Sequence, residues 1–220
     1  MGDTTDGGAI QGIYHIDTIS SDVSAKDCSP LDLVRLLFDM LEYNRPIRAV
    51  HTSSGMKVEL AVCGKTTHAR VDMTIAQMAP GMQVDELLVL LLQEDKRNRE
   101  WEAERDGDDA EACLIASAIG AFQKYNRKRE KLGYALLEHR LFPGIVILGS
   151  SPVFYKIDVT RELAEAVKRG VCPSTTTVVE RHVPAVPRPE KRDEEGMKPL
   201  DNRRIMLGCY QAMKKFISWD

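Results

Sequence analysis

The side chains that could do chemistry are an isolated acid, Asp72, and a short charged segment, Glu94-Asp95-Lys96, that closes a leucine-rich run. If that run is extended, Glu94 and Lys96 lie two residues apart and share one face of a strand. Two carboxylates can share a divalent cation, and magnesium prefers oxygen ligands and retains several waters. A bound cation of this kind lowers the pKa of a water, and a lysine can hold that water or offset phosphate charge. Asp72, Glu94 and Lys96 therefore form a candidate site for phosphodiester hydrolysis.

A hairpin is the element expected to position Asp72. Residues 56–62 lead to the polar turn 64–67, and residues 70–76 return from it. In the returning segment Val71, Met73 and Ile75 alternate with Asp72 and its neighbours, which is the period of a strand with one buried face. Asp72 is then expected on the face opposite Val71 and Met73.

The segment 84–97 decides whether the three charges can meet. Its leucines and glutamates favour a helix by propensity, and that helix could run from Asp85 to Arg105. Alternatively, residues 87–92 form a central strand buried on both faces, which is typical of a continuous apolar run. Periodicity alone leaves both alternatives open. With a helix, Glu94 and Lys96 lie on a solvated face and the chain is a helical interaction protein.

The remaining pattern predicts helices and strands around this centre. A helix is expected to begin at Ser29-Pro30 and end before Pro46, because serine caps helices and proline suits their first position. A second helix starts near Asp108 or Asp109, and strands follow at residues 145–148 and 153–159. Thr160 is expected to cap a helix that ends at Gly170. The fold class is therefore α+β, with a central mixed sheet flanked by helices.

A basic cluster lies near the end of the second helix and comprises Lys124, Arg127, Lys128 and Arg129. Cations are favoured at a helix C-terminus by the helix dipole, so these side chains can simply be solvated. They are also candidates for contacts to nucleic acid.

Three parts of the chain are distinguished by composition. Residues 1–28 are polar and are expected to form a flexible arm, and residues 29–170 form the α/β core. Residues 171–220 begin as a proline-rich extended arm, and an apolar-faced helix from Asp201 is expected to pack back on the core.

Composition excludes several classes of protein. The 220 residues carry a formal net charge of −3, which argues against coating nucleic acid through bulk charge. Five scattered cysteines without a CxxC pair make a zinc knuckle or a disulfide framework improbable. The polar N-terminus lacks the features of a signal peptide, and no apolar run approaches the ~20 residues of a membrane span. An intracellular protein, cytoplasmic or nuclear, is expected.

The order of these elements and the Asp72 and Glu94-Asp95-Lys96 motif resemble the PD-(D/E)XK, or restriction-endonuclease-like, nuclease superfamily. The resemblance covers residues 31–160, and Pro143-Gly144 before a strand is similar to fungal members. It implies an α-β-β-β-α-β core and Mg²⁺ or Mn²⁺ held by Asp72, Glu94 and the backbone carbonyl of Asp95. It further implies a catalytic Lys96. Accessory residues are implied on the flanking helices, where Glu42 and Gln123 stand; the second of these helices also offers Glu111.

Two functions follow as expectations. The first is metal-dependent hydrolysis of DNA or RNA at Asp72, Glu94 and Lys96. The second is a catalytically inactive nuclease-like scaffold that binds protein or nucleic acid, with a homo-oligomer as a further possibility. No membrane partner is expected.

Overall fold

The computed structural model describes residues 30–43, 50–78, 86–94 and 110–217. The chain divides into two compact units, Met1–Tyr43 and Asn44–Asp220. In the first unit the structure describes helix α2 (Pro30–Met40), which begins where the sequence predicts. The buried ring of Tyr43 packs against Phe38 with 4.7 Å between the ring centroids, so the aromatic pair closes the end of this helix.

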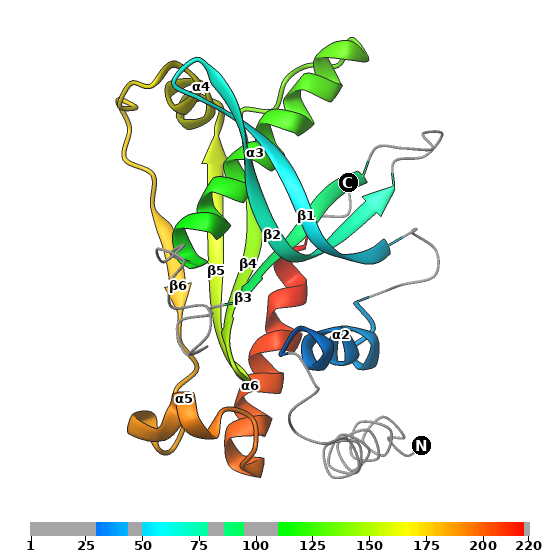
Figure 1. Cartoon of the computed structure of the whole chain (residues 1–220), viewed down its shortest axis with the longest axis vertical. Coiled ribbons are helices and arrows are strands. Elements are labelled where there is room, and N and C mark those ends of the chain that lie inside the picture. The colour runs from blue at the N-terminus through cyan, green and yellow to red at the C-terminus, as the bar shows by residue number, and fades with distance from the viewer. Residues whose placement is uncertain (1–29, 44–49, 79–85, 95–109, 218–220) are drawn as a thin grey trace, which may run out of the picture. The chain divides into compact units, whose positions relative to one another are not determined.

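The second unit contains one sheet of six strands in sequence order. Its strands are β1 (Val50–Val62), β2 (Lys65–Met78), β3 (Glu86–Glu94), β4 (His139–Leu148), β5 (Ser151–Thr160) and β6 (Val179–His182). Its helices are α3 (Ala110–Lys131), α4 (Arg161–Arg169), α5 (Arg192–Glu195) and α6 (Leu200–Met213), with short 3-10 turns η1 (Pro189–Lys191) and η2 (Lys214–Phe216). Figure 1 shows α3 lying across the strands of this sheet.

The sheet consists of two antiparallel halves joined by one parallel pair. Strands β1, β2 and β3 form an antiparallel meander, and β4, β5 and β6 form another. Strand β3 runs parallel to β4, and α3 makes the crossover between them. A parallel pair needs such a crossover, whereas antiparallel neighbours need a short turn. The α+β class and the mixed sheet are thus confirmed.

The leucine-rich run is extended, so the helical alternative for residues 85–105 is wrong over its first part. Strand β3 is paired on both edges, with β2 on one side and β4 on the other. Leu91 is fully buried. A central strand of this kind has little solvated surface, which accounts for its continuous apolar sequence.

The β1–β2 hairpin turns earlier than the sequence pattern predicts. The two turn residues are Cys63 and Gly64, with φ of 50° and 74°, a pair of positive φ values that suits the twist of a tight hairpin. Thr66 and Thr67, which were expected in the turn, belong to β2 and pair with Ala61 and Leu60. Helix α4 fixes the tip, because Val167 O and Lys168 O accept from the amides of Cys63 and Gly64 at 3.0 and 2.8 Å.

Helices cover both faces of the sheet. Helix α3 packs on the face formed by alternate residues of β4 and β5, where Gly144 lies directly below Leu114. Val153 and Tyr155 of β5 face α3, whereas Phe154 between them faces the other side of the sheet. The Phe154 ring meets the Tyr210 ring of α6 edge to face, with 5.1 Å between the ring centroids. Helix α4, which follows β5, is capped as predicted. Thr160 Oγ1 accepts from Leu163 N, and Gly170 has a φ of 73°.

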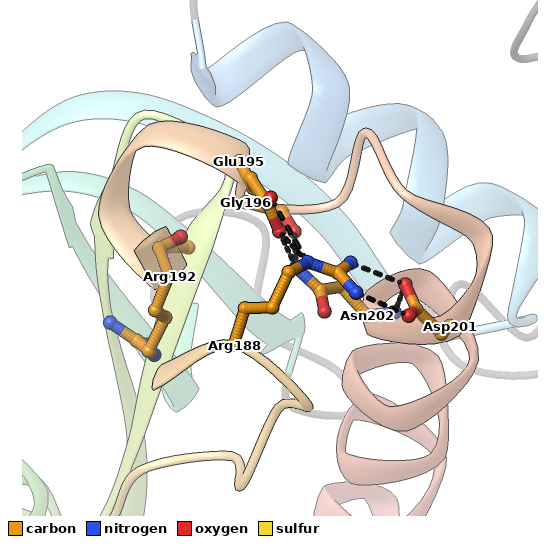
Figure 2. Close-up of polar contacts among 7 residues, drawn as sticks. Arg188, Arg192, Glu195, Gly196, Asp201 and Asn202 are labelled. Carbon is orange, nitrogen blue, oxygen red and sulfur yellow. Dashed lines mark hydrogen bonds and ion pairs between the residues drawn. The ribbon is translucent and has the colours of Figure 1, made fainter. Parts of the chain in front are cut away.

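Arg188 holds the segment before α6 against the start of that helix (Figure 2). Its Nε donates to both carboxylate oxygens of Glu195 at 3.0 and 2.9 Å, and its two terminal nitrogens donate to Asp201 at 2.9 Å each. Asn202 adds bonds from Nδ2 to Glu195 and to Gly196 O at 3.2 and 3.1 Å. The hydrogen bonds from Arg188 hold the pKa of Asp201 below its usual range.

This cluster predicts an acid-sensitive contribution to stability. A carboxyl group whose folded pKa is depressed stabilises the fold above its unfolded pKa, and that contribution is lost as pH falls through the folded pKa. Arg188→Met is therefore expected to lower the urea midpoint at pH 6, and the gap to the wild type should narrow below about pH 4.

The matched control is Arg169→Met, because Arg169 Nε donates to a backbone carbonyl, Glu165 O, at 3.3 Å. Its effect on the urea midpoint should not change over the same pH range. An Arg188→Met gap that stays constant down to pH 3 would contradict this role for Asp201.

Candidate functional site

Asp72 is a buried acid on a strand that is covered on both faces. The residue is 4% exposed, and the whole run from Val71 to Ala76 is buried. Acids are rarely buried to this extent unless a cation, a metal or hydrogen bonds compensate for the lost hydration. The burial of Asp72 therefore marks it as more than an exposed strand residue.

The backbones of Asp72 and Glu94 lie on adjacent strands. Met73 pairs with Leu92, so the register continues by one residue to set Asp72 opposite Gln93. Glu94 is the last residue of β3, and it pairs with Ile147 of β4. The side chain of Glu94 and the whole of Asp95 and Lys96 lie outside the described residues, so their roles stay predictions.

A shared site for Asp72 and Glu94 requires a local break in strand alternation. Residues directly opposite in an antiparallel pair share a face, and a shift of one residue changes the face. The pairing of β2 with β3 shifts between Ile75 and Ala76, and Val71 and Ala76 belong to the same core cluster although five positions separate them. Gly55, which continues the β1 register opposite Asp72, has a φ of 67°. The register shift thus lies three residues beyond Asp72, on the side away from Glu94.

A pocket of about 390 Å³ lies near the same end of β4. Val146 and Leu148 line it, and they flank Ile147, the backbone partner of Glu94. The start of α3, residues 151, 153 and 155 of β5, and residues 181 and 192–193 complete the wall. Ligand sites commonly form at the carboxyl ends of parallel strands, where a crossover helix begins.

A hydrogen-bonded group spans this pocket. Tyr155 donates to Glu111 Oε2 at 2.7 Å, and Arg181 Nε donates to the Tyr155 hydroxyl at 3.2 Å. Burial, together with the bond to Glu111, raises the pKa of Tyr155 to about 12. The phenol therefore stays neutral near pH 7 and acts as a donor to the carboxylate.

Sequence reasoning found part of this group. Glu111 was noted at the start of the helix, but Tyr155, Arg181 and Arg192 were not singled out. Tyr155 reads as one of several apolar positions in a strand, and Arg181 and Arg192 stand in the proline-rich segment. These side chains reach the pocket because β6 pairs with β5. The four residues of β6 show no strong strand pattern in the sequence.

Gln123 has a structural contact in place of an accessory role near Asp72. Its Oε1 accepts from Ala61 N at 2.9 Å, and its Nε2 donates to Ala61 O and Ala164 O at 3.1 Å each. Ala61 pairs with Thr66, and the six residue steps from Thr66 to Asp72 span about 20 Å of strand. The structure therefore does not bring Gln123 and Asp72 together.

The basic cluster at the end of α3 is partly engaged in internal contacts. Arg127 forms an ion pair with Glu59, and Arg129 Nε donates to Ala135 O at 2.7 Å. The 16-residue step from Glu111 to Arg127 corresponds to about 24 Å along the helix. This cluster lies away from the pocket, so its predicted contacts to nucleic acid would fall outside the candidate site.

Three further expectations concern Glu42, a bound metal and a membrane span. Glu42 belongs to the first unit, so its accessory role stays a prediction. Among the described residues there is no cluster of three or more histidine, cysteine, aspartate or glutamate side chains placed to bind a metal. Within the same ranges, no helix has the length and apolar character needed to cross a membrane.

Comparison with protein families, with curated proteins and with solved structures finds no match to this chain. The resemblance to the PD-(D/E)XK superfamily therefore rests on the motif and on the order of elements.

Proposed function

We propose that this chain is a metal-dependent nuclease that hydrolyses phosphodiester bonds of DNA or RNA. The observation that carries the proposal is the extended β3, which ends at Glu94 beside the strand that carries the buried Asp72. The helical alternative would have separated these acids, and the structure removes it for residues 86–94.

The order of elements supports the same proposal. A helix precedes an antiparallel three-strand meander, α3 crosses over, and β4 returns parallel to β3. This is the α-β-β-β-α-β order that the restriction-endonuclease-like resemblance implies. A fold can host several functions, so the order of elements supports the proposal less strongly than the acids do.

The proposed donor set consists of oxygens, namely the carboxylates of Asp72 and Glu94 and the carbonyl of Asp95. Oxygen ligands suit Mg²⁺ or Mn²⁺, and the burial of Asp72 is consistent with a carboxylate that has a cationic partner. When bound, the metal would supply Lewis-acid polarisation of the scissile phosphate. Lys96 would hold the attacking water. As the water oxygen bonds to phosphorus and the ester P–O bond breaks, the departing oxygen would take up a proton that the water gives up.

The test is a cleavage assay on single- and double-stranded DNA and RNA, with Mg²⁺, with Mn²⁺ and with EDTA. We expect cleavage in the presence of either metal, none in EDTA, and a loss of about 100-fold or more in Lys96→Ala. The control is Lys65→Ala, because Lys65 is an exposed lysine at the start of β2. Cleavage that survives Lys96→Ala at the wild-type rate would remove this mechanism.

The inactive scaffold is the second candidate, and the strand register favours it. Regular pairing sets Asp72 opposite Gln93 and one residue out of step with Glu94. Calorimetric titration with Mn²⁺ separates the two candidates. Binding that Asp72→Asn abolishes supports the nuclease, whereas no binding and no cleavage of any substrate would support the scaffold.

A further inference from the structure

The pocket at the start of α3 contains two arginines on separate segments. Arg181 stands on β6, the edge strand, and Arg192 opens α5. Strand β5 lies between β4 and β6 and contributes Val153 and Tyr155 to the wall. Two guanidinium groups that approach one pocket from different elements suggest a ligand with several acceptor oxygens.

Arg192 is largely buried, and one of its donor nitrogens lacks a hydrogen-bond partner among the described residues. Its side chain is 12% exposed, Nη1 donates to Asp193 Oδ1 at 2.7 Å, and Nη2 donates to Pro152 O. Its Nε is buried and has no hydrogen-bond partner among the described residues. That buried N–H costs free energy, whereas each terminal nitrogen keeps a second N–H that can donate to a ligand.

Arg181 offers donors on the other wall. Its Nε bonds to the Tyr155 hydroxyl at 3.2 Å, and within the described ranges no partner is recorded for its two terminal nitrogens. The side chain is 55% exposed, so a ligand can reach it. The planar fork of a guanidinium matches the oxygens of a phosphate group.

The acids on the wall are arranged around these arginines. Glu111 accepts from Tyr155 and lies 3.8 Å from Arg181 Nε, and Asp193 accepts from Arg192. These contacts orient the two guanidinium groups before a ligand arrives. Tyr155, whose hydroxyl stays protonated near pH 7, adds no negative charge. The first turn of α3 also contributes Ala110 to the wall, where backbone dipoles favour an anion.

We infer that this pocket binds a phosphate group of a nucleic-acid strand through Arg181 and Arg192. The inference rests on the proposed function for the identity of the ligand, and it names a contact outside the Asp72 and Glu94 site. The pocket is lined by Val146 and Leu148, which face the other side of β4 from Ile147, the backbone partner of Glu94. A phosphate bound there would therefore hold the nucleic-acid strand at the end of β4.

The test measures binding in EDTA, so that a metal at Asp72 contributes nothing. Calorimetric titrations use inorganic phosphate, a short oligonucleotide with a 5′-phosphate, and the same oligonucleotide with a 5′-hydroxyl. We expect Arg181→Gln and Arg192→Lys each to weaken phosphate binding about tenfold, since each removes charge-assisted hydrogen bonds. Arg192→Lys keeps the positive charge but removes the planar guanidinium. Weaker binding in this variant would therefore show that the geometry of the guanidinium donors matters.

The control is Arg161→Gln, which removes an exposed arginine paired with Glu138 at 3.1 Å and should leave binding within about twofold. Tighter binding of the 5′-phosphorylated oligonucleotide would identify a terminal phosphate, and equal binding of both oligonucleotides would identify an internal one. Wild-type binding to none of the three probes, or binding that neither variant weakens, would overturn the inference. Phosphate binding without any metal-dependent cleavage would instead leave the pocket standing and remove the proposed nuclease.

Discussion

Asp72→Asn is expected to reduce metal-dependent cleavage by about 100- to 1,000-fold while the protein stays folded. The amide has nearly the shape of the carboxylate, so it fills the same buried space beside β2. It lacks the negative charge that a divalent cation needs from its ligands. The measurement is the initial rate of cleavage in Mg²⁺, beside a Mn²⁺ titration and a urea unfolding curve.

The matched control for that substitution is Asp158→Asn. Asp158 is an acid on β5 whose side chain is 50% exposed and lies 3.2 Å from His139. The same chemical change there should leave cleavage and Mn²⁺ binding unaltered. If Asp72→Asn cleaves at the wild-type rate, Asp72 is not a metal ligand. If it unfolds, Asp72→Glu provides the second measurement, because it keeps the charge and should retain Mn²⁺ binding.

The sequence predicted the parts of the fold that local patterns determine. Thr160 and Gly170 bound α4 because a hydroxyl cap and a positive φ are local requirements. The leucine-rich run left two alternatives, because burial on both faces removes the alternation that distinguishes a strand from a helix. Pairing with β2 and β4 settles it as a strand, and that pairing is a property of the whole sheet.

The sequence suggests the residue types of the candidate site but not whether the fold brings them together. A strand with one buried face does not predict the burial of Asp72, and the position of Asp72 relative to Glu94 depends on a one-residue register. Gln123 illustrates the same limit. Its polar side chain on a helix suggested a site residue, but it bonds to Ala61 and Ala164, which lie 62 and 41 positions away.

Gly120→Ala is expected to destabilise the protein, although alanine is the better helix former. Gly120 lies in α3 where the helix crosses β1, and an added Cβ would stand 2.9 Å from Glu59 O and 3.0 Å from Val58 Cγ1. The oxygen belongs to a paired strand, so relief requires the helix or the sheet to shift. Overpacking of this kind costs about 1–3 kcal/mol, which exceeds the helix-propensity gain of up to about 1 kcal/mol.

Gly208→Ala is expected to stabilise the protein, in contrast to Gly120→Ala. Gly208 is an exposed residue of α6, and an added Cβ would meet nothing within 4 Å. The free energy of unfolding should therefore rise by about 0.5–1 kcal/mol in that variant. Urea unfolding of both variants, monitored by circular dichroism, measures whether each substitution raises or lowers the free energy of unfolding. Stabilisation by both alanines would show that α3 does not pack against β1 as closely as these distances require.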